Sequence, residues 1–257
     1  MATSATIQLI RNATLRIQYA GHHILVDPMF FPQGAFDPLA GKARNPMVEL
    51  PLPAEEIIKD IDLVLVTHTH PDHFDPIASE MLDKSVQLFN QPADEEFFQA
   101  ANFLNATTIG DHTTWNNLTI HRTGGLHGSG EILKKMGTVS GFVLQAQDQP
   151  TIYLVGDSIW TEEVELAIQK FRPDYIVANT GGAVFPGFEE HPILMDEEQA
   201  RTLVQNSGNA KVIAVHMEAL DHCRTTRTSL RQVAEEANIS KEQLIIPQDG
   251  EVVHLVL

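Results

Sequence analysis

Three histidines and an aspartate lie within six positions of one another in the segment His68-Thr69-His70-Pro71-Asp72-His73. His68 and His70 are two residues apart, so in an extended segment both imidazoles project to the same side. Pro71 fixes the turn that follows, which lets Asp72 and His73 point in another direction. Imidazole nitrogen and carboxylate oxygen are donors that bind zinc, manganese or iron. The spacing therefore predicts a metal site rather than a solvated loop.

The run 61–66, directly before this segment, is apolar and rich in β-branched residues. Such a run is typical of a buried strand. The histidine segment is therefore expected to be a loop at the end of a strand.

The pattern His-x-His-x-Asp-His after a strand resembles the signature of the metallo-β-lactamase-fold hydrolases. That family has three further ligands in a fixed order, and the chain has a candidate for each. His127 lies in a glycine-rich segment, Asp157 in Gly-Asp-Ser, and His216 directly after an apolar run. The resemblance implies an α+β fold, a four-layered αβ/βα sandwich, as a single metallo-hydrolase domain over residues 1–257.

The resemblance also implies two divalent metal ions and a role for each ligand. The predicted ligands form two sets with a shared bridge: His68, His70 and His127 for one metal; Asp72, His73 and His216 for the other; and Asp157 between them. The implied reaction is hydrolysis of a small ester, lactone or amide, with or without a phosphate group, by a hydroxide held between the metals. Asp72 and Asp157 are the predicted catalytic carboxylates. Zinc, manganese and iron all suit the nitrogen and oxygen donors.

Four more residues have predicted supporting or substrate roles. Asp75 is predicted to orient one imidazole from behind, and Ser158 to support the site through its hydroxyl. His191 and His222 are candidates for substrate contact, although a surface role is equally consistent with the sequence. His222 also competes with His216 for the last ligand position, and the buried strand predicted directly before His216 favours His216.

Composition limits the classes of partner. The chain has 257 residues, 43% of them hydrophobic, which is enough for one large core. Its formal charge of −17 argues against a nucleic-acid partner, which requires a basic surface. The single cysteine, Cys223, favours a reducing, cytoplasmic location, and no run approaches membrane-spanning length. The expected partner is a small-molecule substrate, and the sequence leaves the oligomeric state open.

The predicted elements alternate along the chain. Short strands are expected at 5–10, 14–19 and 23–27, followed by a proline-rich surface loop over 29–53 and a brief helix from 54. The remaining predictions are helices at 76–83, 94–103, 161–170, 196–206 and 225–238, and strands at 86–89, 107–123, 139–145, 151–155, 174–178, 211–215, 244–246 and 252–257. Strand-rich halves with helices between them fit two sheets faced by helices.

Three functions from different classes remain open. The first is the small-molecule hydrolase, and the branch that the chain resembles includes ascorbate-6-phosphate lactonase. The second is a phosphodiesterase for a small nucleotide or a phospholipid head group, with Arg44, Arg224 and Arg227 as candidate anion contacts. The third is a non-catalytic metal-binding or sensing module, which the intact ligand set disfavours. Glu218 has no assigned role at this point.

Overall fold

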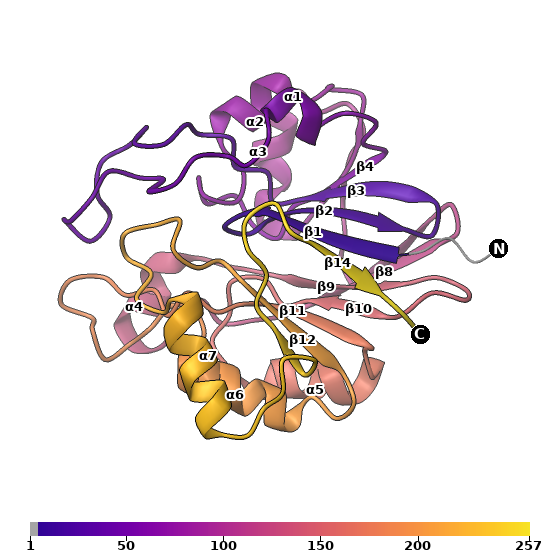
Figure 1. Ribbon diagram of the computed structural model, residues 1–257. Coiled ribbons are helices and arrows are strands. Elements are labelled where there is room, and N and C mark those ends of the chain that lie inside the picture. The colour runs from indigo at the N-terminus through magenta and orange to yellow at the C-terminus, as the bar shows by residue number, and fades with distance from the viewer. Residues whose placement is uncertain (1–4) are drawn as a thin grey trace.

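The computed structural model describes residues 5–257, and its strands form two seven-stranded sheets that face each other (Figure 1). The first sheet has the order β14-β1-β2-β3-β4-β5-β6. Its strands are β1 (Ala5–Arg11), β2 (Thr14–Tyr19), β3 (His22–Val26), β4 (Leu63–Leu65), β5 (Gln87–Asn90), β6 (Ala106–Thr108) and β14 (Val252–Leu255). The second has the order β13-β12-β11-β10-β9-β8-β7. Its strands are β7 (His112–Trp115), β8 (Leu118–Thr123), β9 (Gly141–Gln145), β10 (Ile152–Leu154), β11 (Tyr175–Asn179), β12 (Lys211–Val215) and β13 (Leu244–Ile245).

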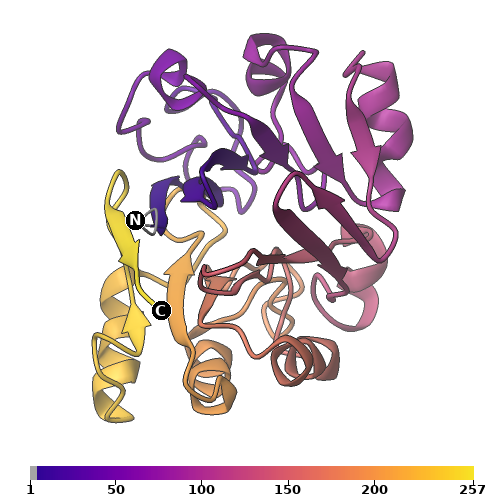
Figure 2. The ribbon, with the colours of Figure 1, turned by 90° about the vertical axis from the view of Figure 1, so that its right-hand side faces the viewer.

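Helices cover the outer face of each sheet, so the layers run helix, sheet, sheet, helix (Figure 2). The helices of the first half are α1 (Ala54–Ile57), α2 (Pro76–Met81), the 3-10 helix η1 (Pro92–Asp94) and α3 (Glu95–Ala100). Those of the second half are α4 (Gly130–Met136), α5 (Glu162–Phe171), α6 (Glu197–Asn206) and α7 (Arg227–Glu236). This arrangement confirms the predicted αβ/βα sandwich.

Apolar side chains fill the space between the sheets and the space under each helical layer. Ile17 of the first sheet and Phe142 of the second are fully buried in the central cluster. Strands β4 and β11 are buried along their whole length, because each is covered by the other sheet on one face and by helices on the other. Both are parallel to their neighbours, which is typical of strands that read as continuous apolar runs.

Two of the differences between the predicted and the observed elements have identifiable reasons. The strands expected within 107–123 divide between the sheets, because β6 pairs with β5 while β7 begins the second sheet. Helix α4 was not predicted. The helix is short, begins at Gly130 and is followed by Gly137, and Ile132 is its only buried residue, so its apolar pattern is too short to indicate a helix.

The segment 29–53 forms neither a helix nor a regular strand in the structure, in agreement with its proline content, but part of it is buried. The buried Arg11 side chain donates to the carbonyl oxygens of Met29, Phe31 and Val48 at 3.2, 2.8 and 2.9 Å, which fixes the base of the segment. Phe36 and Asn45 pair across it. The segment projects from the same end of the sheets as α4 (Figure 1).

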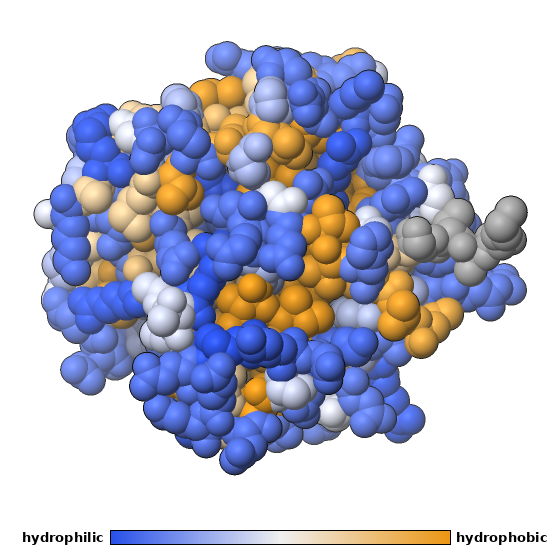
Figure 3. All heavy atoms as spheres, viewed as in Figure 1, coloured by the Kyte–Doolittle hydropathy of each residue, from blue (hydrophilic) through white to orange (hydrophobic). Residues whose placement is uncertain are grey.

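The C-terminal strand β14 forms one edge of the first sheet. Exposed apolar side chains lie along and after it, with Val252 43%, Val256 61% and Leu257 79% exposed. Figure 3 shows apolar atoms gathered on this face along the C-terminal part of the chain. Within residues 5–257, no helix has both the length and the apolarity of a membrane span.

Candidate metal centre

The seven predicted ligands lie close together, and each follows the end of a strand. The histidine segment follows β4 in the first sheet, while His127, Asp157 and His216 follow β8, β10 and β12 in the second. Their ligand atoms fall into two groups, within each of which all atoms lie within 4.8 Å of one another: His68, His70 and His127; and Asp72, His73, Asp157 and His216. These two groups contain the residues of the two predicted sets, each joining residues from both sheets.

Asp157 lies between the two groups. Its Oδ2 is 3.1 Å from His73 Nε2 in one group, and 3.5 Å from His127 Nε2 in the other. Its Oδ1 accepts a hydrogen bond from Asn179 Nδ2 at 2.6 Å, which fixes the carboxylate plane. One oxygen of a single buried carboxylate therefore faces both groups, as a bridging ligand must.

The hydrogen bonds behind the imidazoles determine which ring nitrogens face inward. His73 Nδ1 lies 2.9 Å from Asp27 Oδ2, and His127 Nδ1 lies 2.8 Å from the carbonyl oxygen of Ile193. A carboxylate and a carbonyl only accept, so both Nδ1 atoms carry hydrogen and both Nε2 lone pairs point to the centre. Metal-bound histidines are held in this way. The donor set therefore fits divalent cations.

The electrostatics of the centre also favour a cation. His68 Nε2 lies 3.0 Å from His70 Nδ1, and burial lowers the pKa of His68 well below its usual value. Burial raises the pKa of Asp157, but the surrounding imidazoles, His73 first among them, have a larger opposite effect. The resulting pKa is well below the ordinary value. The carboxylate therefore stays ionised. The positive charge that it stabilises in this structure is carried by His73 and His216, whose pKa values are raised by Asp157, and divalent cations would supply that charge in their place.

Asp27 orients an imidazole from behind, the role predicted for Asp75. Besides contacting His73, Asp27 accepts from the Thr67 amide and hydroxyl at 2.8 and 2.7 Å. Asp27 was not among the predicted site residues, although it directly follows β3, which runs parallel to β4, the strand before the segment His68 to His73. An aspartate at the end of that neighbouring strand was the available signal.

Asp75 has a different function, which corrects the prediction. Its Oδ1 caps α2 by accepting from the Ala78 amide at 2.6 Å, and its Oδ2 accepts from the amides of Phe30 and Phe31 at 2.6 Å each. Among the described residues, no imidazole lies within hydrogen-bond distance of this carboxylate. Asp75 therefore supports the backbone around the centre and does not orient a ligand.

Ser158 supports the loop that carries His127. Its Oγ accepts from the Leu126 amide at 3.0 Å and donates to the Ile159 carbonyl at 2.8 Å. The preceding turn requires Gly156, whose φ is +72° and whose missing Cβ would lie 2.6 Å from the Ser140 carbonyl oxygen. The Gly-Asp-Ser sequence thus places the aspartate at the centre and ties the neighbouring loop to it.

His216 is held in a left-handed backbone conformation, with φ of 64°. Its amide donates to the Asn12 carbonyl at 2.9 Å, and its Nδ1 lies 3.8 Å from Cys223 Sγ. Its Nε2 faces Asp72 Oδ2 at 3.1 Å. Neither Asn12 nor Cys223 had a predicted site role: Asn12 is far from every ligand in the sequence, and Cys223, seven residues after His216, indicated only a reducing compartment.

A cavity of about 470 Å³ opens onto the cluster. Its apolar lining comes from five parts of the chain: segment 29–53, the histidine segment, α2, α4 and the loop after β11. The apolar residues are Phe31, Phe36, Leu39, Pro71, Pro76, Met136, Phe185 and Ile193. Its polar lining consists of four predicted ligands and one further residue: His70, Asp72, His127, Asp157 and His222. None of the described residues that line it is a lysine or arginine.

The structure separates the two histidines predicted to contact substrate. His222 lines the cavity, is 5% exposed and packs on the ring of Phe185 at 5.3 Å. Its Nδ1 is buried without a hydrogen-bond partner among the described residues, and burial lowers its pKa to about 4. His191 is exposed, lies 3.1 Å from Ser129 Oγ, and is not among the described residues that line the cavity.

The three arginines considered as anion contacts lie outside this cavity. Arg44 pairs with Asp37, and Arg224 is exposed. Arg227 pairs with Glu218 and Asp249, which gives Glu218 a structural role.

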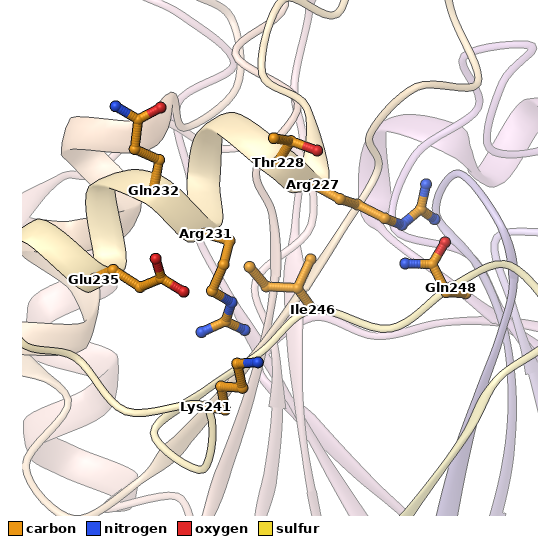
Figure 4. A pocket seen from close by; sticks show the side chains of 8 residues that line it. All are labelled: Arg227, Thr228, Arg231, Gln232, Glu235, Lys241, Ile246 and Gln248. Carbon is orange, nitrogen blue, oxygen red and sulfur yellow. The ribbon is translucent and has the colours of Figure 1, made fainter.

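Arg227 lines a second, polar cavity of about 490 Å³ along α7, away from the cluster. Figure 4 shows the Arg227 side chain extending toward Gln248, while Arg231 and Lys241 lie together near Ile246.

Comparison with known proteins agrees with this geometry. Residues 22–217 match the model of the β-lactamase superfamily domain. The chain belongs to the β-lactamase superfamily. A metal-dependent hydrolase of Pyrococcus abyssi is 29% identical over 58% of this chain and 67% of its own. Protein YddR of Bacillus subtilis (strain 168) is 33% identical over 95% of this chain and 98% of its own.

Two solved structures are similar to this chain over nearly its whole length. One is a possible metal-dependent hydrolase from Veillonella parvula, with TM-score 0.94, 34% identity, and coverage of 98% of this chain and 100% of the other. The other is an isothiocyanate hydrolase from Delia radicum gut bacteria, with TM-score 0.89, 35% identity, and coverage of 96% and 98%. The chain is accordingly a metal-dependent hydrolase of the β-lactamase superfamily, and the predicted family is confirmed.

Proposed function

We propose that this protein is a dinuclear metal-dependent hydrolase for small, uncharged electrophiles that carry an apolar group. The observation that supports this most directly is the cavity over the ligand cluster, whose side walls are phenyl rings and aliphatic side chains. An apolar substrate group is stabilised there, whereas an anionic group finds no lysine or arginine. The whole chain would act as one unit, in the reducing compartment that its single cysteine favours.

The two ligand groups would each hold one divalent ion, with Asp157 as the shared ligand. Ions bound there would acidify a water molecule and polarise the substrate. Asp72 is the most accessible of the two cluster carboxylates, since its side chain is 16% exposed and that of Asp157 only 3%. Burial raises the pKa of Asp72, but His73 and His216 lower it far below its usual value. Ionised Asp72 is therefore proposed to accept a hydrogen bond from the attacking water and orient it, because a carboxylate with such a low pKa is a weak base.

His222 is proposed to contact the substrate rather than a metal. It is the only polar side chain among the described lining residues that is outside the ligand groups. Its low pKa keeps the ring neutral near pH 7, with one nitrogen able to donate and the other to accept. A neutral imidazole in an apolar wall can orient the heteroatom of an uncharged substrate.

Esters, lactones and amides fit this cavity, and isothiocyanates are a further candidate class. The support is the 35% identical relative named isothiocyanate hydrolase, together with the uncharged cavity. In this reaction the water oxygen bonds to the central carbon of R–N=C=S, and the nitrogen is protonated. The carbon–nitrogen bond then breaks as the second proton of the water passes to the nitrogen, so that R–NH₂ and carbonyl sulfide leave. The phosphodiesterase alternative receives no support, because the candidate arginines are paired or outside the cavity.

The test is a substrate panel on the metal-loaded protein: benzyl isothiocyanate, phenyl acetate, a γ-lactone and bis-p-nitrophenyl phosphate. We expect turnover of at least one neutral substrate at a kcat/KM at least about tenfold above that of the phosphodiester, equal to about 1.4 kcal/mol. Leu39→Lys adds a cation to the cavity wall and should narrow this preference. Faster hydrolysis of the phosphodiester by the unmodified protein would refute the proposal.

A further inference from the structure

Asp221 receives hydrogen bonds from a continuous part of segment 29–53. Its Oδ1 accepts from the Leu39 and Ala40 amides at 2.9 and 3.2 Å. Its Oδ2 accepts from the amides of Ala40, Lys42 and Ala43 at 3.2, 3.2 and 3.4 Å. Such charge-assisted bonds to a carboxylate are stronger than neutral ones. One side chain thus organises the tip of a segment that has no regular secondary structure.

Asn45 closes the same arrangement from the other side of the segment. Its Nδ2 donates to Asp221 Oδ1 at 2.9 Å, and its Oδ1 accepts from the Asp221 amide at 2.8 Å. Asn45 is fully buried, so these reciprocal bonds are shielded from water. The Met47 amide adds a bond to the Ala219 carbonyl at 2.7 Å. The tip of segment 29–53 is therefore fastened to the stretch 219–221.

These contacts reach the cavity wall directly. The amide of Leu39 is bonded to Asp221, and the side chain of Leu39 lines the cavity. Phe36, also in the wall, exchanges two backbone hydrogen bonds of 2.9 Å with Asn45. Phe31 is held independently, since its carbonyl accepts from Arg11 and its amide donates to Asp75. Leu39 and Phe36 thus depend on Asp221, whereas Phe31 does not.

We propose that Asp221 is a positioning residue for substrate specificity, which holds Leu39 and Phe36 against the cavity so that substrates with a bulky apolar group bind there. The proposal rests on the proposed function for its substrate class. A loop with few regular hydrogen bonds has low local stability, so removal of its main anchor should let the wall move away while the strand-borne ligands stay in place. Burial raises the pKa of Asp221, but the bonds from Asn45 and the segment amides lower it to about 2, so the anchor is ionised at neutral pH.

The experiment compares Asp221→Ala with Asp37→Ala on the metal-loaded, full-length protein. Asp37 is an exposed carboxylate of the same segment that pairs only with Arg44 in the side-chain contacts of residues 5–257, which makes it a matched control. The first readout is amide hydrogen exchange of residues 36–45. We expect at least tenfold faster exchange in Asp221→Ala, no change in β4 or β12, and no change in metal content. In Asp221→Asn, which keeps one acceptor oxygen, the exchange rate of residues 36–45 should lie between those of the unmodified protein and Asp221→Ala.

The second readout is the ratio of kcat/KM for benzyl isothiocyanate to that for methyl isothiocyanate. This ratio should fall about tenfold in Asp221→Ala through a higher KM for the benzyl substrate, and stay constant in Asp37→Ala. A general loss of folded protein would lower the apparent kcat/KM of both substrates equally. The ratio would then stay unchanged, and that result would overturn the proposal. Unchanged hydrogen exchange would overturn it as well.

A third readout separates this proposal from the proposed function. If the unmodified protein turns over neither isothiocyanate, the proposed substrate class fails while the anchor can still be tested through binding. Benzyl alcohol is then the probe, and its affinity is measured by NMR titration. Weaker binding to Asp221→Ala by about tenfold, with unchanged binding to Asp37→Ala, supports the role of Asp221. Equal binding to both variants refutes it.

Discussion

The ligand cluster and the apolar cavity wall touch each other but are built in different ways. The ligands follow the ends of strands in both sheets, and residues such as Asp27 and Ile193 fix the imidazoles from behind. Most of the apolar wall comes from segment 29–53, α4 and the loop after β11. Strand ends hold catalytic groups within the narrow tolerance that chemistry demands. Loops supply a shape that can change without disturbing that chemistry.

Removal of the shared ligand should have the largest effect and should leave the wall intact. In Asp157→Ala both groups lose a donor, so both metals should bind more weakly. Activity should fall by more than about 100-fold, beyond the range for a supporting residue. The measurements are elemental analysis after metal reconstitution and steady-state turnover, with the exposed Asp111→Ala as control. Two tightly bound ions in Asp157→Ala would show that the bridge lies elsewhere.

The contrast between His216 and His222 tests where the cluster ends and the wall begins. His216→Ala should lose one of the two ions and abolish turnover, because its Nε2 belongs to the second ligand group. His222→Ala should keep both ions and raise the KM, because His222 lies in the wall. Metal titration and kinetics are to be measured on both variants side by side. If His222→Ala is the variant that loses metal, the two assignments must be exchanged.

The pair Asp27 and Asp75 separates support of a ligand from support of the backbone. Asp27→Asn should weaken metal binding about 10–100-fold, because it disturbs the hydrogen bond that sets the His73 tautomer. Asp75→Asn should leave metal affinity unchanged and lower the free energy of unfolding by about 1–3 kcal/mol, through the α2 cap and two backbone amides. Metal titration and denaturant unfolding distinguish the two outcomes. Equal metal loss in both variants would contradict the corrected assignment.

The buried His222 introduces a pH dependence of stability, an effect that is absent at pH 7.5 and appears only in acid. Burial lowers its pKa to about 4, while an unfolded histidine titrates near about 6.5. Between these values the unfolded chain binds a proton that the folded chain does not, so stability falls as the pH drops below about 6.5. Relative to wild type, His222→Gln should therefore gain about 2 kcal/mol on going from pH 7.5 to pH 5. Denaturant unfolding of both metal-loaded proteins measures this, and parallel pH curves would exclude a neutral His222.

The sequence was sufficient to predict the fold and the grouping of the seven predicted ligands. It was insufficient to predict the apolar wall of the cavity. His68 to His73 are adjacent in the chain, and the later candidates follow apolar runs, so local patterns carried that information. Leu39 and Phe36 belong to a segment whose path depends on Asp221, about 180 residues later, and no periodicity reports such a contact. Asp75 was assigned a ligand-supporting role because it is near the motif in sequence, whereas Asp27 is near it in space through the β3–β4 pairing.

Each ligand group takes members from both sheets, and the turn after β1 adds a direct connection, since the Asn12 carbonyl accepts from the amide of His216. An ion bound in either group would connect the two halves of the molecule and stabilise their packing against each other. Metal affinity and the free energy of docking the two sheets are then linked quantities, because the ion binds only the assembled arrangement. A core substitution such as Phe142→Ala, remote from every ligand in the sequence, would weaken the packing between the sheets and with it the metal affinity. Metal retention can thus report on how firmly the halves are assembled.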